Sequence, residues 1–554
     1  MIRWVLRYWH TLRYLKVEQI AFQLLRQVYR PSPRSGSVLA QRAQSSDWVA
    51  PITKSSSFTP PGHFTFLGKS GNLSEIGWDG PERALLWRYN QHYFADLLAS
   101  SASERTEAHA ALITDWIAAN PAGQGTGWHA YPTSLRMAAW IKWALAGNRL
   151  PAGACASLAD QARWLSRNLE RHILGNHLFV NAKALLFAGL WFEGPEAQTW
   201  RDLGLKILAR EFPEQILADG GHFELSPMYH CLAVEDVLDL VNIAQSFAAG
   251  LGTQGMAALS MWQELVPQMM RWMAVMRHPD GDIAFFNDAA IGIAPAPEVV
   301  ANYATRLGFP SLPEIESRFT HLQASGYARA ALGPAVLLAD MAKVGPDYLP
   351  GHAHADTLSF ELSLDGYRCV VNGGTSVYGT SAERVRQRGT AAHATALVDG
   401  QDSSEVWSGF RVARRASVKD VHSEIHIDEI KFGATHTGYL RLTRSVLHSR
   451  TWSLSKTGLL ISDHFSGRGQ HNITIGLPIA PDWALSLEGR QVTGRHGKTS
   501  QNVTITAPAE TEVALRDTTW HPEFGIALPA QKVEIRSQAD LPLTLETEIT
   551  WQTS

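Results

Sequence analysis

The chain has 554 residues, of which 45% are hydrophobic and 18% are charged, and its formal net charge is -3. This length exceeds what one ordinary core accommodates, so we expect two or three domains. The slightly acidic balance gives no reason to expect nucleic acid, which normally requires a basic face. Three widely spaced cysteines define neither a disulfide framework nor a zinc knuckle.

The first 30 residues are basic and aromatic. Arg7, His10 and Arg13 interrupt any apolar segment, so neither a cleavable signal nor a spanning helix of ~18 apolar residues is expected. The segment is interpreted either as an amphipathic helix on a membrane surface or as a helix docked on the main body. Residues 31–60, rich in Pro and Ser, indicate a linker or a wrapped arm. A cytoplasmic or cell-associated protein is expected, and a periplasmic location stays open.

Residues from about 80 to 320 carry apolar side chains at helical spacing. Gly and Pro separate the segments, which indicates a succession of helices. The spacing is clearest in two stretches, Leu86, Tyr89, Tyr93 and Leu97, and Val234, Val237, Val241 and Ala244.

From about residue 325 the apolar period becomes two. Leu358, Phe360, Leu362 and Leu364 alternate with polar residues, which predicts a half-buried strand. Asp365-Gly366 follows, and this pair is typical of a tight hairpin between antiparallel strands. Many short strands of this kind favour an antiparallel sandwich.

His352 and His354 lie just before this strand, in the run from Gly351 to Asp356. If the strand extends back through them, both imidazoles share one face, because side chains two residues apart on a strand point the same way. Such a pair can supply a proton-transfer group beside a metal ligand. The alternative is a solvated or hydrogen-bonded pair at a sheet edge.

Two polar runs stand in the helical half. Asn176 and His177 follow Gly175 and precede an apolar helix, where Asn176 could instead serve as a helix cap. Tyr229 and His230 lie just before another helix, and a buried tyrosine satisfied by the backbone is the alternative interpretation there.

These runs occur in a fixed order, and with other segments they make the chain resemble the heparinase II/III family of polysaccharide lyases. The likeness extends from about Leu85 to at least Arg415. The matching segments are Trp87 to Phe94, Trp128 to Arg136, Gly175 to His177, Glu224 to His230, His278 to Asp282, Phe286 to Asp288, Gly351 to Asp356, and Arg388 to Thr395.

The resemblance implies a multidomain α+β chain, in which an incomplete (α/α) toroid is followed by an antiparallel β-sandwich and a glycan binds between them. The expected domains are an N-terminal helical extension and linker arm at 1–64, a catalytic toroid at 65–324 and the sandwich at 325–554.

The resemblance also implies β-elimination at a uronic acid. The C5 proton of a uronate is weakly acidic, so the site must neutralise the carboxylate and stabilise an enolate, while a base and an acid act at C5 and O4. Asn176 resembles the neutralising amide, and Tyr229 and His352 resemble the catalytic pair. Supporting or substrate-binding residues are His177, His230, Arg136, Arg88, Glu224 and Arg388. Ordinary ion pairing is the alternative for the arginines.

A structural zinc site is a further implication of the resemblance. His354 and His393 match two ligands, and Asn372 stands where an aspartate is expected. An amide oxygen is a poorer zinc ligand than a carboxylate, so Asp356 could substitute, and a metal-free hydrogen-bonded cluster remains the alternative. No organic cofactor is expected.

The sequence therefore predicts a lyase acting on an anionic, uronate-containing polysaccharide. A uronyl C5-epimerase and a non-catalytic glycan-binding or assembly protein are the alternatives. A glycosidase would need two carboxylates flanking the cleft, and Glu224 and Asp288 are possible candidates for that pair. The identity of the glycan and the oligomeric state do not follow from the sequence.

Overall fold

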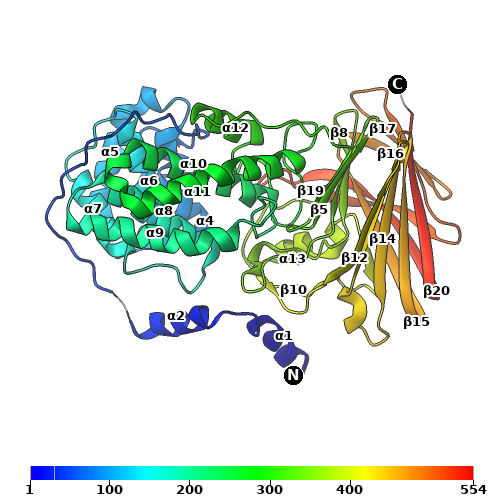
Figure 1. Cartoon of the computed structure of the whole chain (residues 1–554). Coiled ribbons are helices and arrows are strands. Elements are labelled where there is room, and N and C mark those ends of the chain that lie inside the picture. Colours follow the sequence, from blue (N-terminus) through cyan, green and yellow to red (C-terminus); the bar gives the residue numbers. More distant parts are fainter. Residues whose placement is uncertain (1, 30, 553–554) are drawn as a thin grey trace.

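The computed structural model describes residues 2–29 and 31–552, without the side chains of residues 2 and 3. A helical part is followed by a domain of antiparallel strands, and the two lie side by side (Figure 1). The expected toroid followed by a β-sandwich is thus confirmed. Among the described residues, no helix is both long and apolar enough to cross a membrane.

The helical part is built around α8, which packs against α6, α9 and α10. Nearly every residue of α8 is buried, as expected for a helix that is apolar on all sides. The helices of this part are α4 (Leu85–Tyr93), α5 (Thr106–Ala119), α6 (Ala130–Leu145), α7 (Ala154–Leu165), α8 (Gly175–Trp191), α9 (Pro195–Gln215), α10 (Pro227–Ser246), α11 (Ala248–Val275) and α12 (Pro297–Arg306).

Of the two predicted helical stripes, the second lies on one helix and the first is divided between two elements. All four residues of the stripe that begins at Val234 are buried on α10. The first stripe is interrupted, because Phe94 adopts a left-handed conformation (φ 58°) and ends α4 at Tyr93. Leu97 is buried in a separate short 3-10 turn, Ala95–Leu98.

The sheet domain contains two long strands, β15 and β20, that pair antiparallel over most of their length. The first half of β15 pairs with β14 and its second half with β9 and β8, so β15 joins the two parts of the sheet. Strands β5 to β8 and β13 to β15 bury their apolar side chains in a common core.

The strands of this domain are β4 (Phe319–Leu322), β5 (Tyr327–Leu332), β6 (Ala335–Asp340), β7 (Phe360–Leu364), β8 (Tyr367–Val370), β9 (Ala396–Val398), β10 (Val406–Trp407), β11 (Arg411–Val412), β12 (Val418–Ile425), β13 (Glu429–His436), β14 (Leu447–Ser455), β15 (Gly458–Ile479), β16 (Trp483–Glu488), β17 (Gln491–His496), β18 (Asn502–Thr506), β19 (Glu512–Trp520) and β20 (Leu528–Trp551); a short helix α13 (Ala382–Arg388) joins β8 to β9.

The predicted strand before the Asp-Gly turn needs two corrections. β7 begins only at Phe360, and it is buried on both faces instead of one. The polar face is covered because His278 hydrogen bonds to Glu361 and Ser363, at 2.8 Å each. The hairpin itself is confirmed, since Leu364 pairs with Tyr367 across the turn.

The N-terminal segment forms α1 (Ile2–Leu12) and α2 (Val17–Val28), which lie along one side of the molecule below the junction of the two parts (Figure 1). The following segment runs over the helical part, where the Arg42 amide donates to the Trp191 carbonyl at 2.8 Å and the Lys54 amide to the Leu98 carbonyl at 2.9 Å. A small sheet of β1 (Phe58–Thr59), β2 (His63–Phe66) and β3 (Lys69–Asn72), followed by α3 (Leu73–Ile76), then leads into α4.

Candidate active site

A cleft of about 1730 Å³ is lined by both parts of the chain. Asn176, His177 and Tyr229 contribute to its wall from the helical part. His352 and Tyr378 contribute from the sheet domain. The three residues predicted to be catalytic therefore converge in one cleft, although they are far apart in the sequence.

Asn176 and His177 occupy the first turn of α8. Gly175 precedes them at φ 57°, a backbone conformation that favours glycine, and a Cβ there would also lie 2.2 Å from a methyl carbon of Leu349. The residue at the cap position is Leu174, so Asn176 is not the helix cap and its amide lines the cleft.

His177 is positioned by a carboxylate behind it. Its Nδ1 donates to Glu170 at 3.1 Å, and its ring lies against Tyr131 with 4.5 Å between centroids. Burial alone would lower the pKa of His177, but Glu170 outweighs burial and raises that pKa above its usual value. The raised pKa favours the protonated imidazole, the form that attracts an anionic ligand.

Tyr229 lies in the first turn of α10, where Ser226 caps the helix and accepts the Tyr229 amide at 3.2 Å. Tyr229 therefore lies inside the helix, and the prediction that it lies just before the helix is wrong. Its hydroxyl is 2.9 Å from the Tyr378 hydroxyl. Burial raises the pKa of Tyr229 well above its usual value, so the phenol is protonated at neutral pH and can donate a proton.

His352 stacks on the Tyr229 ring, with 3.9 Å between centroids and 15° between planes. Its Nδ1 donates to the carboxylate of Glu224, which is buried. Burial alone would raise the pKa of Glu224, but the neighbouring His352 lowers it, so the carboxylate is ionised. This bond fixes the imidazole tautomer with the proton on Nδ1 and leaves Nε2 as an acceptor.

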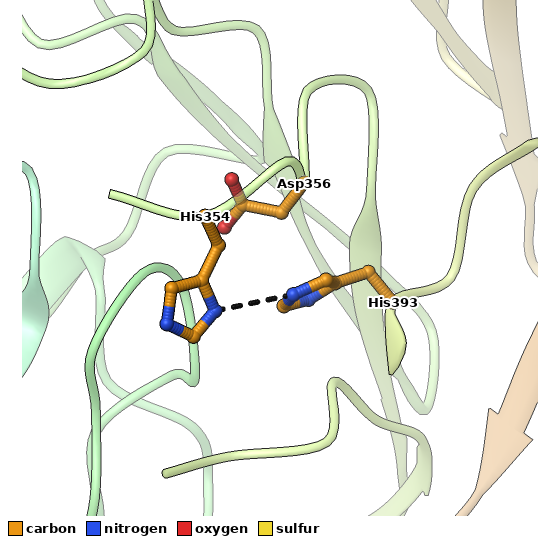
Figure 2. Close-up of side chains that lie close together, drawn as sticks. All are labelled: His354, Asp356 and His393. Atoms are coloured by element: carbon orange, nitrogen blue, oxygen red, sulfur yellow. Dashed lines mark hydrogen bonds between the residues drawn. The ribbon is translucent and has the colours of Figure 1, made fainter. Parts of the chain in front are cut away.

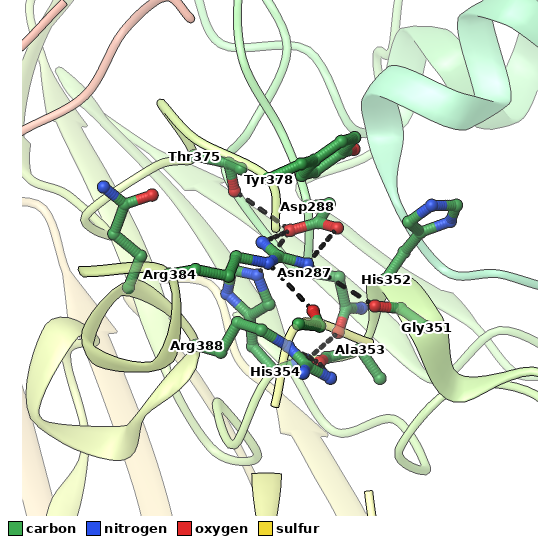
Figure 3. A network of polar contacts seen from close by, with 12 residues as sticks. Asn287, Asp288, Gly351, His352, Ala353, His354, Thr375, Tyr378, Arg384 and Arg388 are labelled. Atoms are coloured by element: carbon green, nitrogen blue, oxygen red, sulfur yellow. Dashed lines mark hydrogen bonds and ion pairs between the residues drawn. The ribbon is translucent and has the colours of Figure 1, made fainter. Parts of the chain in front are cut away.

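His354 faces a different region from His352, which corrects the expectation of a shared strand face. The 3-10 turn Pro350–His352 ends just before it, and both histidines precede the first residue of β7. Figure 3 shows His352 pointing away from the buried network around Asp288. There the His354 Nε2 donates to Asp288 at 2.8 Å.

Asp288 anchors this network. It binds the two terminal guanidinium nitrogens of Arg384, which is fully buried, and its own amide donates to the His352 carbonyl at 2.9 Å (Figure 3). Burial alone would raise the pKa of Asp288, but Arg384 and His354 lower it. Asp288 is therefore a buried anion that positions the His352 loop, and it is not a carboxylate flanking the cleft as a glycosidase would need.

A candidate metal centre is formed by His354, Asp356 and His393, whose ligand atoms all lie within 4.8 Å of one another (Figure 2). The His354 Nδ1 is 3.2 Å from the His393 Nε2. Two nitrogens bound to one tetrahedral zinc lie about 3.4 Å apart, so the pair fits such an ion. The Asp288 carboxylate behind His354 is the outer partner that metal-bound histidines usually have.

The donors are also in a suitable protonation state. Burial lowers the pKa of His393 to about 4, and it lowers that of His354, so both imidazoles are neutral at neutral pH. Two residues are available for the third ligand position, Asn372 and Asp356. The Asn372 side-chain oxygen accepts the amide of Ala394 at 3.2 Å, and the Asp356 carboxylate lies with the two imidazoles in one cluster.

Five predicted supporting residues are not among the described residues that line the cleft: Glu224, which holds His352, and His230, Arg136, Arg88 and Arg388. His230 is buried and lies 2.9 Å from the Met269 carbonyl. Arg136 is buried with its guanidinium carbon 3.8 Å from the centre of the Trp116 ring, and Arg88 pairs with Asp79 at 2.8 Å. Arg388 donates to the Ala353 carbonyl at 2.8 Å and so holds the His352 loop.

The sequence interpretation missed Tyr378. Its hydroxyl is the hydrogen-bond partner of Tyr229, and its ring lies 6.1 Å from that of His352. It stands in a loop after β8 without any spacing pattern, so only the packing of the two parts brings it to the cleft.

Two protein-family models match this chain. The family model described as the heparinase II/III N-terminus matches residues 86–314, and the one described as heparinase II/III-like, C-terminal, matches residues 314–552. A heparin-sulfate lyase of Bacteroides stercoris is 26% identical over 253 residues, which are 42% of this chain and 37% of the relative. One of Pedobacter heparinus is 27% identical over 276 residues, covering 44% and 39%.

Solved structures show the same fold. The heparan sulfate lyase HepC of Pedobacter heparinus superposes with a TM-score of 0.58 at 19% identity, covering 89% of this chain and 81% of that one. A structure of heparinase III gives a TM-score of 0.66 at 18% identity, covering 84% and 76%. The chain spans about two fifths of the length of the curated relatives it matches. Because the two family models together match residues 86–552, the chain belongs to the heparinase II/III family.

Proposed function

We propose that the protein is a polysaccharide lyase that cleaves a uronate-containing glycan by β-elimination. The observation that carries this proposal is the stacked pair of Tyr229 and His352, which lines one cleft together with Asn176. The family and the relatives named heparin-sulfate lyases support it.

Each step of the elimination has a residue suited to it. The Asn176 amide donates hydrogen bonds to the uronate carboxylate and withdraws charge from it, which acidifies the C5–H bond. His352 accepts the C5 proton on Nε2, and the carboxylate of Glu224 stabilises the resulting imidazolium.

The Tyr229 hydroxyl then protonates O4 as the C4–O4 bond breaks and the C4–C5 double bond forms. The phenolate then takes up a proton from solvent and the His352 imidazolium releases one to solvent, so the pair returns to its starting state. The raised pKa of Tyr229 supports the role of proton donor.

The charges of the cleft favour a uronate polymer without dense sulfation. Three lysines of the lining bind carboxylates of the lining: Lys54 binds Glu235, Lys142 binds Asp239 and Lys183 binds Asp236. Among the described lining residues, Lys69 and Arg411 are the cations without a carboxylate partner. A densely sulfated chain would require many more free cations.

We also propose that His354, Asp356 and His393 hold a zinc ion with a structural role. The ion would tie the loop that carries His352 to the segment after α13, and no step of the elimination passes through it. The fit of the two imidazole nitrogens and the outer partner Asp288 support this assignment.

The test is incubation of the purified chain with matched polymers: heparosan against heparan sulfate, and chondroitin against chondroitin sulfate, with alginate added. New ultraviolet absorbance from a 4,5-unsaturated uronate is expected with an unsulfated polymer. Saturated products would instead indicate hydrolysis, and inverted C5 without chain shortening, seen by proton NMR, would indicate an epimerase. Binding without any chemical change would indicate a glycan-binding protein.

A further inference from the structure

Helix α2 packs against the molecule with its polar side inward. Gln19 is only 5% exposed, and its amide donates to the carbonyls of Ile173 at 3.1 Å and Tyr348 at 3.3 Å. The opposite side is apolar and faces solvent, with Val17 83% and Val28 84% exposed. An amphipathic helix of a globular protein normally buries its apolar side, so α2 is inverted. The exposed apolar residues of α2 are Val17, Ile20, Leu24, Leu25 and Val28.

Helix α1 presents a similar apolar side. Trp4, Val5, Trp9 and Leu12 fall within one side of this helix, and each is more than half exposed. All nineteen tryptophans of the chain lie in the described residues, and Trp4 and Trp9 are the two that are exposed. Together α1 and α2 form an N-terminal helical pair, defined as residues 4–29, whose apolar sides are largely exposed, although the Trp4 ring packs edge-on against Trp407 with 6.2 Å between centroids.

The charge of the helical pair is opposite to that of the whole chain. Its cations are Arg7, Arg13, Lys16 and Arg26, against one carboxylate, that of Glu18. That carboxylate binds Arg171 and Arg210 of the helical part. Two more arginines of the sheet domain flank the pair, since Arg411 lies over the Tyr8 ring and Arg415 over the Tyr14 ring.

We propose that the N-terminal helical pair is a docking surface for an anionic lipid bilayer. Exposed tryptophan and aliphatic side chains flanked by arginine and lysine are the features of helices that lie in the plane of a membrane interface. The excess of positive charge matches anionic headgroups, and it would oppose the close approach of a second copy of the same basic surface.

Docking would also orient the cleft. Leu12, Leu15 and Gln19 of the helical pair line the cleft on this side. The helical pair contacts both parts of the chain, because Lys16 binds Glu214 and the Trp407 indole donates to Thr11 at 3.2 Å. A bilayer held against the pair would therefore lie beside the opening of the cleft, where a membrane-associated polymer could enter.

The experiment is co-sedimentation of the full chain with vesicles of phosphatidylcholine alone or with phosphatidylglycerol added. Binding to the anionic vesicles is expected, and it should weaken as salt is raised. The double variant Trp9→Glu with Val28→Glu should bind these vesicles at least about tenfold more weakly, because two negative charges enter the apolar side. Neither residue lines the cleft, so far-ultraviolet circular dichroism and thermal stability should stay unchanged.

The matched control is Val421→Glu with Ile427→Glu, two exposed apolar residues of the sheet domain, which should bind as the unaltered chain does. Equal binding to neutral and anionic vesicles, or equal binding of the two double variants, would overturn the proposal. A dimer in sedimentation that the Trp9 and Val28 changes dissolve, without vesicle binding, would overturn it in favour of an interface between copies. These readings need no substrate and are independent of the proposed lyase activity.

Discussion

Replacing Glu224 by glutamine tests whether the buried carboxylate positions and charges His352. The change keeps the size of the side chain, and the amide oxygen can still accept the Nδ1 proton of His352. It removes the negative charge that stabilises the imidazolium formed when C5 loses its proton. A hydrogen bond to a charged group contributes about 1.5–3 kcal/mol, so kcat should fall roughly 10- to 150-fold.

KM should change less than about twofold, because Glu224 is not among the described residues that line the cleft. The contacts that bind the substrate in its ground state are therefore preserved. The assay is the initial rate of unsaturated-uronate formation on a polymer that the unaltered chain cleaves. Glu361→Gln is the matched control, since Glu361 is also a fully buried partner of a histidine, His278, outside the cleft. A kcat for Glu224→Gln within threefold of the unaltered value, or an equal loss for folded Glu361→Gln, would refute the reasoning.

Tyr229→Phe removes only the hydroxyl and should lower the rate about a hundredfold or more with the fold retained, whereas a rate within a few-fold would make Tyr229 a packing residue. Asn176→Ala should lose a comparable factor, measured in the same assay, because the uronate carboxylate stays unneutralised. His354→Ala should lose both zinc, counted by elemental analysis, and thermal stability, and a metal-free but fully active unaltered protein would contradict the zinc assignment. Burial lowers the pKa of His230 to about 3 and of His222 to about 4. Because the unfolded chain binds these protons from pH 6.5 downward and the folded chain does not, stability should fall between pH 6.5 and pH 4, by roughly 2 kcal/mol per histidine at pH 5. Urea unfolding at pH 7 and pH 5 measures this loss of stability. The loss between the two pH values should be smaller for His230→Gln, and an equal loss would contradict the prediction for His230.

The order of the two structural parts could be predicted from the sequence, because periodicity is local. A helix that buries one side repeats its apolar residues at three and four, and the stripe from Val234 to Ala244 shows this directly. The Asp365-Gly366 hairpin was equally predictable, since a tight turn needs particular residues within two positions. The three candidate catalytic residues followed from the resemblance of their surrounding runs to those of a known family.

Tertiary structure alone decided which side chains share a space. His352 and His354 are two residues apart, yet one faces the cleft and the other a buried cluster, because the strand that would align them begins only at Phe360. Spacing fixes a common face only inside a regular element, and these residues precede one.

Sequence spacing also fails to predict which predicted site residues face the cleft and which face the core. Arg136 and His230 lie in matching runs, but their helices turn them into the core, and the direction of a helix face depends on its neighbours. Tyr378 and Asp356 enter their sites through loops whose course is set by packing between the two parts. The inverted packing of α2 is the extreme case. Its sequence determines an amphipathic helix, and only the contacts of Gln19 with the body decide that the apolar side faces outward.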